Sequence, residues 1–243
     1  MMALKPREWG YTNPIIAPLY PKPPIYWVGA KVQLVLYEAD IDAIRSVVPE
    51  PLEVTSNKVI AWISDLPMGT QGPGQEACIY VTVRYKDCVG TYEPFLYVGH
   101  EIPLAGGREI WGFCKKLANI SLTFDKEVVL GEVERRGTKI MKLQNTIDEP
   151  ASLSELPLGP VFSLKYIPGA AEGEPPLRQL VYTRADLKAR PGEFFRGRGS
   201  ASYERSEIDP TYVLSPGKVI AGYYGTCDMV LPLGEIVYRY PEG

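Results

Sequence analysis

The chain has 243 residues, of which 45% are hydrophobic and 23% are charged, and its formal net charge is −3. This composition provides enough apolar side chains for a sizeable core and excludes an intrinsically disordered protein. The slightly acidic balance predicts neither a nucleic acid nor an anionic membrane as a partner, and no stretch approaches the roughly 18 apolar residues of a membrane span.

Glycine and proline, 23 of each, divide the sequence into short segments typical of β-rich folds. The first strand is predicted at residues 26–37, and a short helix follows at residues 40–48 with Asp40 as its N-cap. Residues 135–138 are predicted as a hairpin turn, and a second short helix or turn is predicted from Gly107 toward Lys115. Further strands are predicted at residues 58–64, 76–87, 92–98, 117–124, 128–135, 139–144, 161–167, 177–183 and 234–240.

This order of elements favours an α+β fold that is mostly β. No internal repeat or linker-like segment interrupts it, so residues 1–243 are expected to form a single domain. The spacing of the cysteines supports neither a zinc site nor a disulfide framework, and it fits reduced thiols in a cytoplasm. The cysteines are Cys78, Cys88, Cys114 and Cys227.

His100 is the only histidine, which excludes metal sites built from several histidines. Its position ahead of Lys115 would allow a role as an acid or base, but a lone histidine between a strand and a glycine-rich turn is more typical of a structural role. The sequence contains no GxSxG, no P-loop and no complete GxGxxG after a strand. If the protein is an enzyme, lysine, tyrosine and carboxylate side chains must carry the chemistry.

The adjacent lysines Lys115 and Lys116 follow an apolar, aromatic run that includes Trp111 and Phe113. Apolar surroundings and a neighbouring cation both favour the neutral form of an amine, and a neutral amine is what imine formation with a ketone requires. A bare pair of lysines is more often a solvated start of a strand. The surrounding motif therefore decides between the two interpretations.

That motif, GREIWGFCKKLA at residues 107–118, closely resembles the catalytic stretch of acetoacetate decarboxylases. Residues 42–53, with Pro-Glu-Pro-Leu-Glu at their end, resemble a second segment of the same family. Residues 228–232 and 235–238 resemble its closing strands. The three matches follow the family's order and spacing over about 200 residues, so the resemblance covers most of the chain.

The resemblance implies that Lys115 is the lysine that forms the Schiff base and that Lys116 is the second lysine of the pair. It places the family's acid/base glutamate on Glu76. Phe113 keeps the aromatic character of the residue before the lysine pair, whereas Cys114 stands where the family usually has proline.

Two positions depart from the family. Ala30 falls where the resemblance places the arginine that binds the substrate carboxylate, and Trp62 falls where it places a second glutamate. Alanine cannot replace the two-pronged, charge-assisted hydrogen bond of an arginine. Arg108, inside the motif, is the alternative partner for an anion, and a structural ion pair is an equally good interpretation of it.

The resemblance predicts a closed, cone-like antiparallel β-barrel with the lysine in its apolar interior, and a homo-oligomer. It implies a cofactor-free lyase in which the Lys115 imine accepts electrons from a small oxo acid. Because two polar groups are lost at Ala30 and Trp62, we favour aldol, dehydration or hydration chemistry on pyruvate with an aldehyde co-substrate. Tyr224 and Glu76 are then the candidates for moving protons.

Two alternatives remain open. The first is a true decarboxylase of acetoacetate or another 3-oxo acid, which would bind the substrate carboxylate through a cation such as Arg108. The second belongs to another functional class, a non-catalytic β-barrel that binds a hydrophobic ligand and in which Lys115 is inert.

Overall fold

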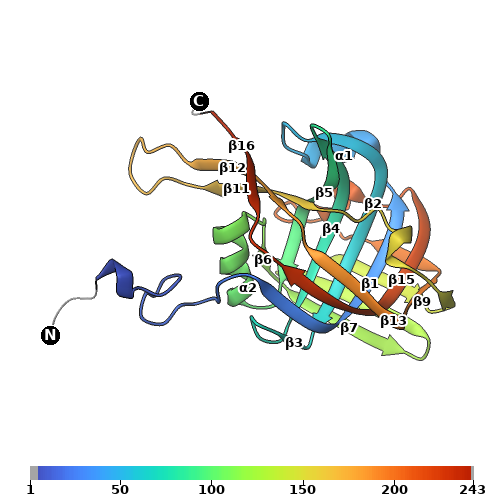
Figure 1. The fold of residues 1–243 in the computed structure, drawn as a ribbon. Coiled ribbons are helices and arrows are strands. Elements are labelled where there is room, and N and C mark those ends of the chain that lie inside the picture. Colours follow the sequence, from blue (N-terminus) through green and yellow to red (C-terminus); the bar gives the residue numbers. More distant parts are fainter. Residues whose placement is uncertain (1–4, 242–243) are drawn as a thin grey trace.

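The computed structural model describes residues 5–241, which form two sheets and a few short helices (Figure 1). The larger sheet has 12 strands, and most of its pairings are antiparallel. In sheet order these are β10 (Glu149–Pro150), β13 (Asp186–Gly197), β15 (Lys218–Leu231), β1 (Ile25–Glu38), β2 (Glu53–Leu66), β4 (Gly74–Tyr85), β5 (Cys88–Val98), β11 (Val161–Ile167), β12 (Leu177–Thr183) and β16 (Glu235–Arg239), while β3 (Met68–Gly69) pairs with β1 and β6 (Lys116–Leu117) with β5.

The second sheet packs against one face of the first. It contains β14 (Gly199–Ser202), β9 (Thr138–Thr146), β8 (Val128–Arg135) and β7 (Asn119–Asp125) in that order. The helical elements are α1 (Ile41–Val47), α2 (Glu101–Gly106), a π-helical turn at Gly107–Trp111, and 3-10 turns at Pro6–Glu8, Leu153–Glu155 and Thr211–Leu214. Within the described chain, none of these helices is long and apolar enough to cross a membrane.

Each face of the large sheet covers its own hydrophobic core, because successive side chains of a strand point to opposite faces. On β1, Val35 packs into a core shared with Met141 and Leu143 of the second sheet. Its neighbour Leu34 packs on the opposite face, in a core that also contains Trp62. This second core surrounds the candidate site.

The structure confirms most of the predicted elements. The helix begins where expected, and Asp40 Oδ1 accepts hydrogen bonds from the backbone nitrogens of Asp42 and Ala43, each at 2.9 Å. The predicted hairpin joins β8 to β9, and Arg136 and Gly137 adopt φ values of 52° and 79°, as such a turn requires. The mostly β, α+β fold is confirmed.

Other expectations differ from the structure. The helix predicted from Gly107 begins earlier, at Glu101, and ends before Lys115. The strand β13 and the part of β15 before residue 228 were not predicted. Pro191 and Gly192 interrupt the pattern of β13 at a shift in register, and glycines dilute that of β15.

The closed barrel is not confirmed. The path of paired strands ends at β10 and at β16 without joining them. The strand β11 pairs with β5 through only two residue pairs and then continues into a hairpin with β12 that extends away from the sheets (Figure 1). The last strands are thereby directed away from the β10 edge.

Candidate active site

The turn before the lysine pair is fixed at both of its ends. The carbonyl of Gly107 accepts hydrogen bonds from the nitrogens of Gly112 and Phe113, both at 3.0 Å, and Gly112 has a φ of 82°, which favours glycine. Trp111 is buried, and its indole nitrogen donates to the carbonyl of Pro232 at 2.8 Å. The lysine segment therefore leaves a rigid turn.

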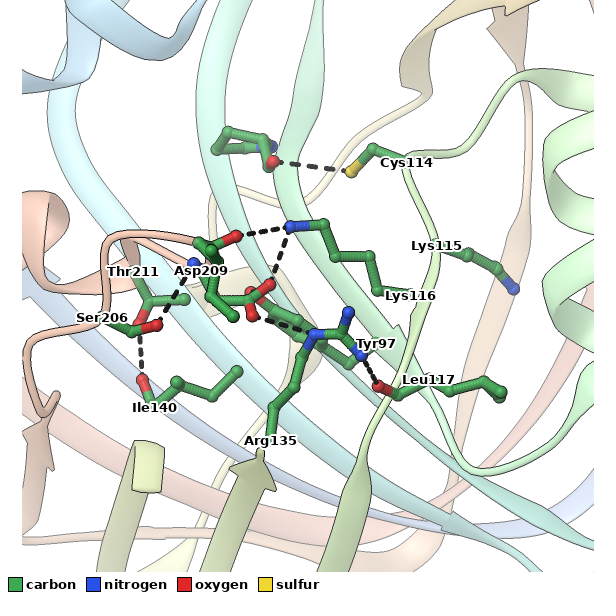
Figure 2. A network of polar contacts seen from close by, with 12 residues as sticks. Tyr97, Cys114, Lys115, Lys116, Leu117, Arg135, Ile140, Ser206, Asp209 and Thr211 are labelled. Atoms are coloured by element: carbon green, nitrogen blue, oxygen red, sulfur yellow. Dashed lines mark hydrogen bonds and ion pairs between the residues drawn. The ribbon is translucent and has the colours of Figure 1, made fainter. Parts of the chain in front are cut away.

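Lys115 and Lys116 extend to opposite sides of this segment (Figure 2). The Lys116 ammonium donates to Asp209 Oδ1 at 2.7 Å and to the carbonyl of Ile208 at 2.8 Å. Asp209 is buried and also accepts a hydrogen bond from Arg135 Nε at 2.8 Å. Lys116 thus belongs to an ion-pair network away from Lys115, and the expected effect of its charge on the amine of Lys115 has no support in this geometry.

Lys115 is 4% exposed, and its Nζ donates to Glu76 Oε2 at 2.8 Å. The same nitrogen lies 5.6 Å from the centre of the Phe113 ring, a distance suited to a cation–π interaction. Its carbon chain fits against Gly107, where an added Cβ would approach Lys115 Cδ to 2.6 Å. A larger residue at this position would force the lysine chain to shift.

These groups line a cavity of about 610 Å³ in the second core. Its least exposed walls include Trp62, Leu96 and Phe113, and its exposed edge includes Arg184 and Asp186. The cavity is therefore lined mainly by apolar side chains and is open to solvent at this edge. The cavity is also lined by Trp27, Tyr80, Thr91, Glu93, Leu153, Leu156, Leu158, Met229 and Leu231, among others.

Two ionisable groups of this cavity, Glu93 and Arg184, were not predicted from the sequence. Glu93 of β5 is buried, and burial together with the nearby charge of Glu76 raises its pKa to about 8, although Lys115 acts in the opposite direction. Arg184 follows β12, and its guanidinium lies 5.4 Å from the centre of the Tyr182 ring. A lone glutamate in an otherwise uncharged strand was the available signal for Glu93, whereas no sequence signal identified Arg184.

Among the predicted site residues, Trp62 and Phe113 line the cavity with Lys115 and Glu76. Ala30 is fully buried in the surrounding core, in agreement with its lack of any anion-binding group. Arg108 is exposed, donates to the backbone carbonyl of Lys115 at 3.3 Å and lines a separate cavity of about 210 Å³.

Tyr224 also lies elsewhere. Its ring packs edge-on against Phe124 of the second sheet at 5.0 Å, because residue 224 points to the face of β15 opposite the cavity. Burial raises its pKa to about 12. The structure thus does not bring Tyr224 or Arg108 to the cavity of Lys115. His100 precedes α2 and lies near Gly74, also outside that cavity.

The site is thus a lysine–glutamate pair in an apolar cavity with a second, buried glutamate. Across residues 5–241, no group of three or more His, Cys, Asp or Glu side chains is arranged to hold a metal ion.

Comparison with known proteins identifies the family of this chain. The family model described as acetoacetate decarboxylase (ADC) matches residues 11–240. An acetoacetate decarboxylase of Acidiphilium cryptum is 32% identical over 241 residues, which cover 96% of this chain and 97% of that protein. The chain belongs to the acetoacetate decarboxylase family.

Solved structures agree with this assignment. The crystal structure of acetoacetate decarboxylase from Legionella pneumophila has a TM-score of 0.85 and 27% identity, and the match covers 92% of this chain and 91% of that one. The enduracididine biosynthesis enzyme MppR, complexed with the condensation product of pyruvate and imidazole 4-carboxaldehyde, has a TM-score of 0.83 at 18% identity, over 96% and 97% of the two chains. This second likeness shows the fold alone.

Proposed function

We propose that this chain is a decarboxylase of a 3-oxo acid that acts through an imine between Lys115 and the keto carbon of its substrate. The observation that carries the proposal is the buried amine of Lys115, 2.8 Å from the carboxylate of Glu76, in the wall of a cavity lined mainly by apolar side chains. Relatives named acetoacetate decarboxylase, similar over almost their whole length, support the same reaction.

The reaction begins when Glu76 accepts a proton from the ammonium group of Lys115. The neutral amine attacks the keto carbon to give a carbinolamine. Glu76 then returns its proton to the departing hydroxyl group, which leaves as water, and a protonated imine results. This cation accepts the electron pair of the bond to the carboxylate as CO₂ leaves, which gives an enamine. Apolar walls such as Trp62 and Leu96 strengthen the attraction between the cation and the developing charge, because they lower the local dielectric.

Arg184 is the cation best placed to hold the substrate carboxylate. It lines the cavity of Lys115, whereas Arg108 does not and Ala30 has no polar group. A guanidinium at the exposed edge can bind a carboxylate with two hydrogen bonds and release CO₂ toward solvent. Ala30 and Trp62 lack the polar groups of the family, and this favoured aldol chemistry. Arg184 and Glu93 supply two other polar groups to the cavity of Lys115 and offset that loss.

The cavity also indicates the size of the substrate. A volume of about 610 Å³ is within the range of roughly 300–1,000 Å³ typical of pockets for drug-sized ligands. Acetoacetate, a four-carbon acid, fills little of such a space. The apolar side chains of Leu153, Leu156 and Leu158 favour a 3-oxo acid with a longer hydrocarbon tail.

The test is a series of 3-oxo acids of increasing chain length, measured by CO₂ release. We expect kcat/KM to rise with the tail, by up to about 15-fold for each added pair of methylene groups, because each buried methylene contributes about 0.8 kcal/mol. Arg184→Gln is expected to raise KM about tenfold or more, with Arg108→Gln as the matched control close to wild type. No CO₂ from any member of the series would contradict the proposal.

The aldol and dehydration chemistry stays a second candidate, because the same volume can hold pyruvate together with an aldehyde. The appearance of a conjugated enone absorbance with pyruvate and aldehydes, without CO₂ release from 3-oxo acids, would place it first.

A further inference from the structure

Glu93 lies at an irregularity in β5. Opposite β4, residues pair as Ile79 with Phe95 and Val81 with Tyr92, so that Glu93 and Pro94 together face a single residue of β4. This is a β-bulge, a feature that redirects side chains and is frequent beside active sites. Pro94 has no N–H to lose from the ladder.

The bulge changes which side chains face the cavity. Thr91 and Glu93 line it, as expected for alternate residues of one strand. Beyond the bulge Leu96 lines it, whereas Phe95 packs on the opposite face. In a regular strand, Glu93 and Leu96, three residues apart, would point to opposite faces. The bulge therefore allows an acidic and an apolar side chain of β5 to share the wall of the Lys115 cavity.

The buried polar atoms on this wall are incompletely paired. Glu93 Oε2 and Thr91 Oγ1 are both inaccessible and have no hydrogen-bond partner in the described part of the chain. Buried polar atoms are rarely left unpaired, because each costs about 1–3 kcal/mol. A carboxyl group held at such a cost beside a reactive amine is more typical of a functional group than of a packing residue.

Burial and the negative charge of Glu76 favour the neutral form of Glu93 and raise its pKa. The charge of Lys115, the hydroxyl of Tyr80 and the thiol of Cys78 act in the opposite direction, and burial outweighs them. On the other side Cys114 donates its thiol hydrogen to the Glu93 carbonyl at 3.1 Å, and Arg108 lines the separate cavity. Glu76, ion-paired with Lys115, and Glu93 are thus two carboxyl groups in different environments.

We propose that Glu93, in its protonated form, is the acid that delivers a proton to the substrate carbon from which CO₂ has departed. The inference rests on the imine chemistry proposed above. After CO₂ leaves, the enamine carbon takes the proton from the Glu93 carboxyl group, and the electron pair of the enamine forms the new carbon–hydrogen bond. The protonated imine returns, water adds to it, and the ketone and the amine of Lys115 are released. Glu93 then regains a proton from water, which supplies the one proton that the overall reaction consumes.

The experiment follows this proton directly. Acetone and 2-heptanone are incubated with the enzyme in D₂O, and the exchange of their protons next to the carbonyl is measured by NMR. In Glu93→Gln, borohydride trapping of the ketone on Lys115 is expected to stay within about threefold of wild type. Exchange is expected to fall by at least about 100-fold, the lower end of the range for general acid catalysis.

Two variants make the result specific. Glu93→Asp keeps a carboxyl group and is expected to recover part of the exchange. Glu132→Gln, on β8 of the second sheet, removes a carboxylate that binds Lys139 at 2.8 Å and is expected to exchange at the wild-type rate. A folded Glu93→Gln protein that is trapped on Lys115 and exchanges at the wild-type rate would overturn the assignment.

Two further outcomes are decisive. A wild-type protein that is never trapped on Lys115 overturns the imine proposal and this inference with it. If Glu93→Gln does not fold, the exchange rate of the wild type is measured at pH values below and above about 8, the pKa of Glu93. Each rate is divided by the fraction of the enzyme that borohydride traps on Lys115. A ratio that rises with the pH and levels off above about pH 8 supports Glu93, because its carboxylate must first take a proton from the carbon next to the imine. A ratio independent of pH overturns its role.

Discussion

The two neighbouring lysines show how strand geometry separates chemistry from structure. Lys115 extends into an apolar cavity and contacts Glu76, while Lys116 extends to the other side and binds the buried Asp209 (Figure 2). Consecutive side chains of an extended segment point in opposite directions, so identical residues meet different surroundings. The same Lys-Lys pair therefore supplies a candidate nucleophile and a structural anchor for β6 and β8.

The most direct way to break this comparison is to remove each amine in turn. Lys115→Ala is expected to lower kcat by at least about 10⁴-fold, because no other nucleophile lies in its place. Lys116→Ala is expected to change kcat by less than about threefold and to cost about 1 kcal/mol of stability, since its side chain is 42% exposed. Steady-state kinetics and urea unfolding measure both effects. Equal losses of activity in the two variants would contradict the separation of roles.

The anchor side is tested through Asp209. Asp209→Ala leaves Lys116 and Arg135 without their common carboxylate, and we expect a loss of about 2–3 kcal/mol in the free energy of unfolding. The expected loss of stability is below the range of about 3–5 kcal/mol for breaking a fully buried ion pair, because Lys116 is partly exposed. Asp209→Asn is the matched control and should lose less. A large fall in kcat with unchanged stability would show that this network takes part in catalysis.

Placement of the Lys115 amine is tested at Gly107. Gly107→Ala puts a methyl group 2.6 Å from Lys115 Cδ, so the flexible lysine chain must shift. We expect kcat/KM to fall by about 10-fold to 100-fold with little change in stability. Gly217→Ala, whose added Cβ meets only the Glu38 carbonyl at 3.4 Å, is the control. A variant of Gly107 with normal turnover would mean that the position of the amine is not critical.

The smallest expected effect concerns pH and the buried Glu93. Its pKa is about 8 in the folded protein and about 4.5 in the unfolded chain, so the folded state retains a proton that the unfolded chain has already lost. Stability should therefore fall as the pH rises from about 4.5 to about 8, by about 1 kcal/mol between pH 6 and pH 7. Glu93→Gln should lack this slope in urea unfolding. Identical slopes in the two proteins would mean that Glu93 is not protonated in the folded state.

Much of this site was predictable because it lies within one motif. The turn, the aromatic residue and the lysine are adjacent in sequence, and Phe113 of this motif lines the cavity with Lys115. Tyr224 was not correctly placed, because the face of a strand residue depends on register, and Tyr223 packs in the core around the cavity while Tyr224 faces the second sheet.

Groups brought together over long distances were harder to predict. Glu93 and Leu96 share the cavity wall only because a bulge changes the alternation of β5, and a bulge has no firm signal in a single sequence. Arg184 arrives through the pairing of β11 with β5 and of β12 with β11, which no local pattern specifies.

The measurement that tests the central claim most directly is peptide mapping after borohydride reduction with a 3-oxo acid or its ketone product. The account predicts one added mass per chain, located on Lys115 and absent from Lys116, in the wild type and in Lys116→Ala alike. It also predicts no added mass in Lys115→Ala. Label on Lys116, or an unmodified wild-type protein that still releases CO₂, would contradict the claim that the buried lysine is the nucleophile.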